Sequence, residues 1–149
     1  MAESFVGGDD CVVILGDNII ADDISQPISN FGDVGGCHIF TKEVHDPERF
    51  GVLDYGETGW GGIEDIIEKP TNPPSNDAVI GLYMYDNTVF DKIRNLDPSE
   101  RGELEVTDLN RMYLKEGKLT AHQIKGTWID CGTFDSLAKA TQKFYHDKN

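Results

Sequence analysis

The chain has 149 residues, of which 38% are hydrophobic and 27% are charged, and these proportions suit one folded domain spanning residues 1–149. Its 27 acidic and 13 basic residues give a net charge of −14 at pH 7, which disfavours nucleic acid as a partner because such binding relies on cationic contacts to phosphates. No apolar run approaches the roughly 18 residues of a membrane-spanning helix, so we expect no membrane association.

The first ten residues are acidic and lack the positive start and apolar centre of a signal peptide, so we expect a cytoplasmic protein. The three cysteines, Cys11, Cys37 and Cys131, show no C-x-x-C spacing and indicate free, buried thiols in a reducing compartment. The four histidines form no i, i+4 pair and have no partner cysteine, which argues against a zinc site.

The predicted elements begin with a short apolar run, Cys11–Leu15, which indicates a strand covered on both faces. The segment Asp22–Phe31 has helical spacing, with Asp23 as a candidate N-cap and Pro27 as an unfavourable feature. Five further segments have the composition of strands. They are 36–42, 50–55, "GGIEDIIEKP", "AVIGLYMYD" and "LTAHQI".

Three helices are expected in the second half of the chain. The first covers 87–95, and the second covers "TDLNRMYLKEG", with Thr107 as N-cap and Gly117 as the stop. After a turn at "GTWIDCGT", the third runs from about 134 to 145. Its expected inner face consists of Phe134, Leu137, Ala138, Thr141 and Tyr145. This mixture predicts an α/β or α+β layer with a mixed sheet.

Two carboxylates occupy the positions where α/β proteins often bind ligands. Asp17 follows the first apolar strand, and Asp130 precedes the last predicted helix. Magnesium in phosphate-handling enzymes is commonly held by one or two carboxylates together with substrate phosphates. From position alone, the alternative that both are capping or turn aspartates stays open.

Four other positions allow a functional and an ordinary interpretation. In "IEKP", Glu68 could accept hydrogen bonds from sugar hydroxyls while Lys69 binds a phosphate. The ordinary interpretation is that the two residues form a surface ion pair. Gly51 suits close backbone approach to a ligand, or a hairpin turn. Arg101 lies among acidic residues in "SERGELE", which suits local charge pairing.

Seven segments carry a family resemblance when they are read together and in order. They are "GGDDCVVILGDNI", "DPERFGV", "IEKP", "SNDAVIGLYMYDN", "PSERGELEVTDLNRMYL", "GKLT" and "WIDCGTFDSL". The chain resembles the sugar-1-phosphate nucleotidyltransferases, most closely the glucose-1-phosphate thymidylyltransferases, from about Glu3 to about Tyr145. The resemblance implies a Rossmann-like α/β fold with a mixed sheet flanked by helices. It also implies in-line attack of a sugar 1-phosphate on a nucleoside triphosphate, with release of pyrophosphate.

The same resemblance implies a role for each matching residue. Asp17 and Asp130 would be the ligands of Mg²⁺. The remaining residues divide by what each is expected to bind. Asn18 and Trp128 would lie next to the metal, and Phe50, Gly51 and Glu68 would line the sugar. Lys69 and Arg101 would be the catalytic cations that bind the sugar phosphate. Val79 would contact the sugar nucleotide.

The chain departs from the family pattern at its start. That pattern opens with a first strand and a glycine-rich loop carrying Arg and then Lys, yet no G-x-G-x-R segment occurs in the 149 residues. We therefore expect a truncated fold without the first strands and the N-terminal nucleotide-binding part. Losing one transition-state donor typically costs about 10²–10³ in rate, so the lone chain is expected to be weak or inactive.

Two consequences concern partners. Glucose 1-phosphate is the expected ligand, and dTTP would bind only where the missing part is supplied. Val12–Leu15 would be an interior strand in the family, so we expect an apolar sheet edge here that a second copy covers, giving a homo-oligomer. The alternatives are a non-catalytic module for sugar-phosphate binding or oligomerisation, and a decayed fragment without a ligand.

Overall fold

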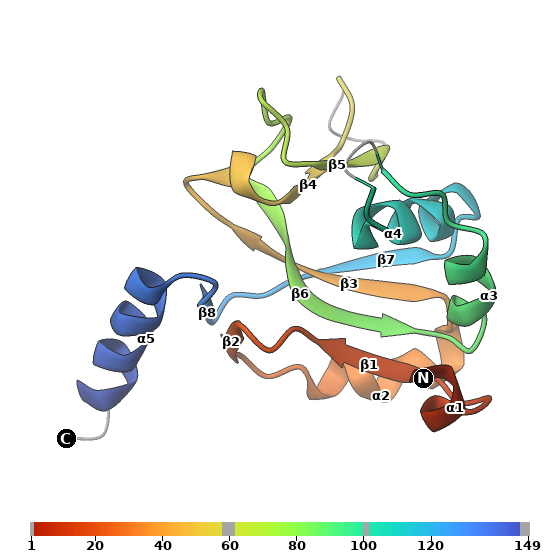
Figure 1. Cartoon of the computed structure of the whole chain (residues 1–149), viewed down its shortest axis with the longest axis horizontal. Coiled ribbons are helices and arrows are strands. Elements are labelled where there is room, and N and C mark those ends of the chain that lie inside the picture. Colours follow the sequence, from red (N-terminus) through yellow and green to blue (C-terminus); the bar gives the residue numbers. More distant parts are fainter. Residues whose placement is uncertain (1, 58–61, 100–101, 147–149) are drawn as a thin grey trace.

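The computed structural model describes residues 2–57, 62–99 and 102–146. Its main sheet consists of six strands. They are β1 (Cys11–Ile14), β3 (Cys37–Glu43), β4 (Gly51–Asp54), β5 (Asp65–Glu68), β6 (Asp77–Tyr85) and β7 (Leu119–Gln123). The sheet order is β5-β4-β6-β3-β7, and β1 pairs with β6 beside this path (Figure 1). The β3–β7 pair is parallel and the other pairs are antiparallel, which confirms the predicted mixed sheet.

Strand β6 is the centre of the sheet. One of its edges pairs with β3, where Tyr83 faces Ile39. Its other edge is shared, because β4 pairs near the start of β6 and β1 pairs over its second half, from Leu82 to Tyr85. The apolar, β-branched and aromatic composition of β6 explains both its length and its burial between two neighbours.

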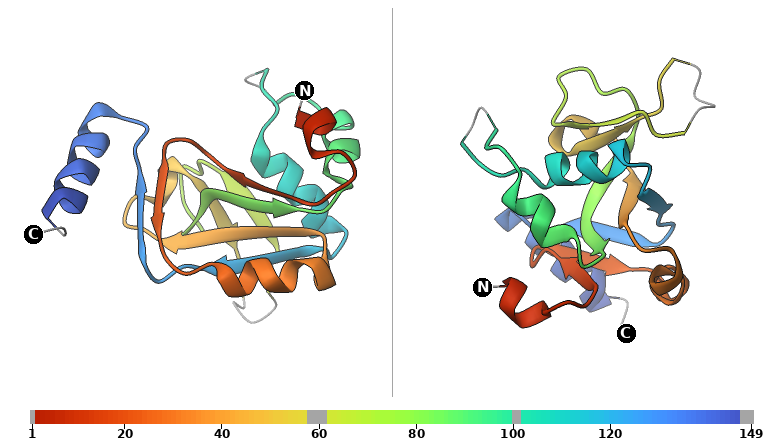
Figure 2. Two further views of the ribbon diagram at one scale, coloured as in Figure 1. Left: turned by 90° about the horizontal axis from the view of Figure 1, so that it is seen from below. Right: turned by 90° about the vertical axis from the view of Figure 1, so that its right-hand side faces the viewer.

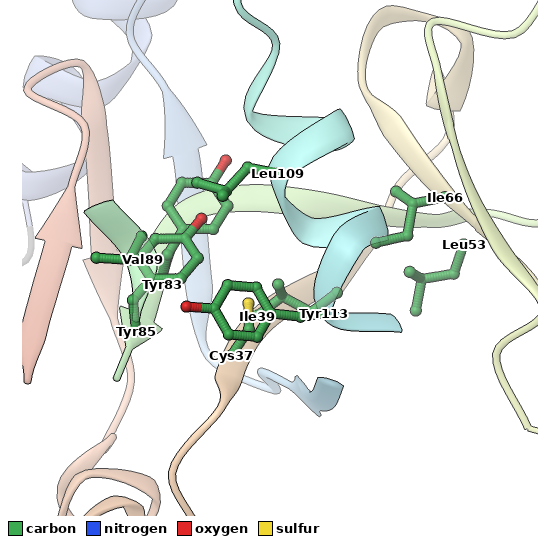
Figure 3. Close-up of a cluster of buried hydrophobic side chains, with 9 residues drawn as sticks. All are labelled: Cys37, Ile39, Leu53, Ile66, Tyr83, Tyr85, Val89, Leu109 and Tyr113. Atoms are coloured by element: carbon green, nitrogen blue, oxygen red, sulfur yellow. The ribbon is translucent and has the colours of Figure 1, made fainter. Parts of the chain in front are cut away.

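The sheet carries an apolar cluster on each face. The helices α3 (Val89–Arg94) and α4 (Val106–Lys115) cover one face, and Figure 3 draws the buried side chains on that face. Its buried side chains are Cys37, Ile39, Leu53, Ile66, Tyr83, Tyr85, Val89, Leu109 and Tyr113. The other cluster includes Phe31 of α2 (Ser25–Val34), packed with Phe40, Ile80, Leu82, Met84 and Ile124. Both clusters meet in β6, whose alternate side chains point to opposite faces.

A separate two-stranded ribbon joins β2 (Asn18–Ala21) to β8 (Thr127–Asp130). The sequence predicted a turn at 126–133 and no strand at 18–21, and the ribbon corrects both expectations. Each strand has only four residues and is half-buried, so neither has a strong apolar pattern.

Three remaining elements are short or peripheral. They are α1 (Ala2–Val6), the 3₁₀ turn η1 (Pro47–Arg49) and α5 (Phe134–His146).

Two helix starts differ from the predictions. Helix α2 begins at Ser25 instead of Asp22, and the Asp23 carboxylate accepts the Ser25 N–H at 2.9 Å without being the N-cap residue. Pro27 is tolerated because N–H groups in the first turn need no helical partner. Helix α4 has Glu105 at its N-cap position, so Thr107 lies inside the helix.

The predicted inner face of the last helix is wrong. Helix α5 extends away from the sheet (Figure 2), and its side chains at 134, 137 and 145 are exposed, with Phe134 at 93%. In the described part of α5, Ala140 is the buried residue. The amphipathic pattern of α5 therefore has no core to face here.

Among the described residues, no helix is long and apolar enough to cross a membrane.

The first strand was expected to be covered on both faces, and the structure corrects this. Val12, Val13, Ile14 and Leu15 are between 37% and 58% exposed. In the described residues β1 pairs with β6 alone, so its second edge is free. An apolar groove of about 540 Å³ runs beside it, bordered also by Phe5 of α1. The prediction of an apolar free edge is thus confirmed, and the buried interior strand is not found.

A histidine pair lies under α2. His38 is 2% exposed, its ring meets Phe31 edge-on at 4.8 Å, and its Nδ1 lies 3.0 Å from His122 Nε2. Burial lowers the pKa of both imidazoles, and the neighbouring His122 lowers that of His38 further. In the folded state, burial therefore favours the neutral form of both rings.

The histidine pair predicts a loss of stability in mild acid. Because the folded pKa values are lowered, the unfolded chain binds more protons below its own histidine pKa of about 6.5, so the free energy of unfolding falls as pH drops below that value. Melting temperatures between about pH 7.5 and about pH 5.5 test this. His38→Gln should make the decrease shallower, and His45→Gln, at an exposed histidine, is the control. A flat profile in the wild type would contradict the prediction.

Candidate functional site

The ribbon of β2 and β8 brings the two predicted metal carboxylates together. Asn18 pairs with Asp130 in register, and the Cys131 N–H donates to the Asp17 carbonyl at 2.7 Å. A Cβ added to Gly132 would lie 3.1 Å from Asp130 Oδ1 and 3.6 Å from Asp17 Oδ2. The two carboxylates therefore border the same point, which a glycine leaves open.

The donor set at this point suits a hard divalent cation. Carboxylate oxygens are the protein ligands that Mg²⁺ prefers, and it usually completes its shell with water and substrate phosphate. In the described part of the chain, no group of three or more His, Cys, Asp or Glu side chains is arranged to hold a metal. Asp17 and Asp130 thus supply two carboxylates, a donor set that fits Mg²⁺ where water or phosphate completes its shell.

The Asn18 side chain links the ribbon to the main sheet. Its Oδ1 accepts the Gly81 N–H of β6 at 3.0 Å and the Trp128 Nε1–H at 2.7 Å. Its Nδ2 donates to Asp17 Oδ1 at 2.9 Å. A Cβ at Gly81 would lie 2.6 Å from Asn18 Nδ2, so a larger residue would displace the amide. Sequence reasoning missed Gly81, although an isolated glycine within a strand is a known signal of close approach.

The predicted sugar side lies at the β4–β5 pair. Gly51 faces Glu68 in register, and the Lys69 N–H donates to the Phe50 carbonyl at 2.9 Å. Glu68 Oε2 accepts the Thr107 hydroxyl at 2.5 Å, which orients the carboxylate. A Cβ at Gly51 would lie 3.1 Å from Thr107 Oγ1, so glycine permits this approach. Thr107 thus contributes to the site, although the sequence suggested a helix cap.

Lys69 has an uncommon backbone conformation. Its φ is +44°, in the left-handed region, although it directly precedes Pro70, which disfavours helical conformations at that position. The exposed Nζ lies 3.6 Å from Glu68 Oε1. Such strain is often found at functional sites, and here it places a cation beside the carboxylate predicted to bind the sugar.

Aromatic side chains connect the two halves. The Phe50 and Trp128 rings meet edge-on at 5.2 Å. Tyr83 belongs to the buried core beside the site; burial raises its pKa, and the negative charges of Glu68 and Asp17 raise it further.

Three residues complete the comparison with the prediction. Val79 lies on the same face of β6 as Gly81 and Tyr83 and packs against the buried cluster beneath α3 and α4. None of its described contacts reaches Asp17 or Asp130. The predicted catalytic residue Arg101 lies outside the described residues. Arg49, which the sequence reasoning did not select, lies with its Nη2 3.6 Å from Asp130 Oδ2. The pKa of Arg49 is raised by its hydrogen bond to Asp46 and by nearby carboxylates, including Asp130.

Comparison with known proteins agrees with this geometry. A family model described as nucleotidyl transferase matches residues 1–147. The chain belongs to the nucleotidyl transferase family. The family resemblance and the fold class expected from the sequence are thereby confirmed.

Named members of the nucleotidyl transferase family are similar along almost the whole chain. The chain is 40% identical to the low-salt glycan biosynthesis nucleotidyltransferase Agl11 of Haloferax volcanii, over 99% of this chain and 42% of that protein. It is 42% identical to glucose-1-phosphate thymidylyltransferase of Neisseria meningitidis, over 94% of this chain and 49% of that protein. The chain spans about half the length of the curated relatives it matches.

A solved nucleotidyltransferase structure has the same fold. A crystal structure described as a glucose-1-phosphate thymidylyltransferase from Bacillus anthracis, in complex with sucrose, superposes with a TM-score of 0.85. The two sequences are 47% identical, and the match covers 95% of this chain and 56% of that one.

The Asn18 contacts predict a measurable loss of order on truncation. Asn18→Ala would leave the Gly81 and Trp128 N–H groups without their acceptor, which should lower the free energy of unfolding by about 1–3 kcal/mol. It should also change Trp128 fluorescence in a Trp60→Phe background. Asn95→Ala, at an exposed helix-end asparagine, is the matched control, and an equal effect at both positions would contradict the role of Asn18.

Proposed function

We propose that these residues form the sugar-phosphate and metal side of a glucose-1-phosphate thymidylyltransferase, which joins glucose 1-phosphate to dTTP and releases pyrophosphate. The observation that carries the proposal is the convergence of Asp17 and Asp130 at Gly132, which the β2–β8 ribbon produces. The similarity to thymidylyltransferases over more than nine-tenths of the chain supports the choice of reaction.

The chain's own groups have distinct tasks in this reaction. Mg²⁺ held by Asp17 and Asp130 would neutralise the charge that develops on the transferred phosphoryl group. Glu68, oriented by Thr107, would accept hydrogen bonds from sugar hydroxyls. Lys69 and Arg101 would hold the sugar phosphate so that its oxygen is aligned for attack. Phe50 and Gly51 would line the sugar, and Val79 would contact the sugar nucleotide.

The triphosphate side of the reaction needs groups that these residues do not offer. No G-x-G-x-R segment occurs in the 149 residues, so the backbone amides and cations around a triphosphate would come from other residues. We propose that the 149 residues alone bind glucose 1-phosphate and transfer weakly or not at all. The same observation favours a second candidate, a sugar-phosphate-binding module without catalysis.

The free edge of β1 supports a proposal about assembly. A second copy pairing antiparallel along β1 would add an identical apolar strand and pair the free backbone groups of this edge. The charge of −14 on each copy opposes this contact, so association should strengthen as salt screens the repulsion.

A cytoplasmic location stays a prediction, for which the free thiols of Cys11, Cys37 and Cys131 are support.

The proposed function predicts a metal-dependent affinity for the sugar phosphate. Glucose 1-phosphate with Mg²⁺ should raise the melting temperature, and Asp17→Asn or Asp130→Asn should abolish the Mg²⁺ dependence. Asp91→Asn, at an exposed carboxylate, is the control. Pyrophosphate release on adding dTTP separates the two candidates, since transfer above background favours the enzyme and binding without transfer favours the module. No shift with either ligand would contradict both.

The β1 edge predicts a salt-dependent homo-oligomer. Light scattering should report a species larger than the monomer in the wild type, and Ile14→Lys should dissociate it, because a charge on the edge blocks strand pairing. Val34→Lys adds the same charge at an exposed apolar residue of α2 and should leave the assembly intact. A wild type that is monomeric at all salt concentrations would exclude this contact.

A further inference from the structure

Arg49 is held at the predicted metal site by three contacts. Its Nη1 donates to Asp46 Oδ2 at 2.7 Å, and its Nη2 lies 3.6 Å from Asp130 Oδ2. The guanidinium also lies over the Phe50 ring, with its Cζ 5.1 Å from the ring centroid. The side chain is 51% exposed, so solvent ions can reach it. A cation is therefore fixed against a candidate metal ligand while open to exchange.

Both oxygens of Asp130 have partners in this arrangement. Oδ1 accepts the Gly132 N–H at 2.9 Å, and Oδ2 faces Arg49. Asp17 Oδ2 borders the same point at Gly132, so two negative charges lie close together. Two carboxylates at one point attract positive charge, and either a guanidinium or a divalent cation can supply it. Arg49 and a metal ion therefore compete for Asp130.

We propose that Arg49 is an exchangeable counter-cation of this site. It pairs with Asp130 when no divalent ion is bound, gives up Asp130 to the ion, and then presents its guanidinium to the phosphate of glucose 1-phosphate. Asp46 and the Phe50 ring keep it in place after the exchange. A planar guanidinium can bind two phosphate oxygens at once, which suits this second contact. The inference rests on the metal site of the proposed function.

The first test measures the metal alone. Mn²⁺ binding to the full chain, without sugar phosphate, is followed by the electron paramagnetic resonance of free Mn²⁺. Arg49→Gln should bind Mn²⁺ roughly two- to five-fold tighter, because an exposed ion pair no longer competes. Arg94→Gln removes the same charge from a side chain of similar exposure that pairs with Glu3 and Asp91, and it should leave the affinity unchanged.

The second test measures the sugar phosphate by calorimetry at saturating Mg²⁺. Arg49→Gln should now weaken glucose 1-phosphate binding several-fold, and Arg49→Lys should restore part of it, because it keeps the charge without the planar fork. Arg49→Gln should therefore tighten Mn²⁺ binding and weaken glucose 1-phosphate binding. A variant that is only misfolded would weaken both ligands, so thermal melts of each variant accompany the titrations.

The outcomes separate this inference from the proposed function. Unchanged or weaker Mn²⁺ binding by Arg49→Gln, or equal tightening by Arg94→Gln, overturns the exchange. If glucose 1-phosphate binding is unaffected in Arg49→Gln, the phosphate contact is overturned. If Asp17→Asn and Asp130→Asn bind Mn²⁺ like the wild type, the metal site itself is wrong. A wild type that binds no Mn²⁺ overturns both.

Discussion

The side-chain amide of Asn18 is the contact on which the geometry of the site depends. It joins three parts of the molecule through the backbone of β6 at Gly81, the indole of Trp128 in β8, and the Asp17 carboxylate. Each partner is a polar group that would otherwise need another acceptor or donor. One amide therefore fixes the ribbon against the sheet and sets the direction of a candidate metal ligand.

The electrostatics of the site follow from the scarcity of cations in this chain. A molecule with a charge of −14 would repel an anionic sugar phosphate at long range, so attraction to the proposed ligand would have to come from a few local charges. Lys69 and Arg49 are each paired with a carboxylate beside the site, at 3.6 Å in both cases. Such pairing keeps a cation in position before a ligand arrives.

Much of the sheet could be predicted because its strands are apolar runs bounded by turn residues, as in β3 and β6. The order of motifs also identified Asp17, Asp130, Glu68 and Lys69 as site candidates. The ribbon could not be predicted, because strands of four half-buried residues have no clear period and their partner lies more than a hundred residues away. Thr107 was misassigned for a different reason, since a threonine before a helix looks like a cap whatever its hydroxyl binds. The exposed face of α5 had the pattern of a buried helix, and a pattern does not show whether a neighbour is present.

The short distance along the chain between β1 and Asp17 would link the proposed assembly to the affinity of the proposed metal site. Asp17 lies three residues after the last residue of β1, so a second copy paired along β1, as proposed above, would hold the chain close to that carboxylate. Restraining a ligand before the ion binds lowers the entropy lost on binding. With the proposed assembly and the proposed metal site, thermodynamic linkage would require the reverse effect, in which a bound ion strengthens the strand contact by the same factor. The exposed strand edge and the proposed metal ligand would then be the two ends of one coupled equilibrium.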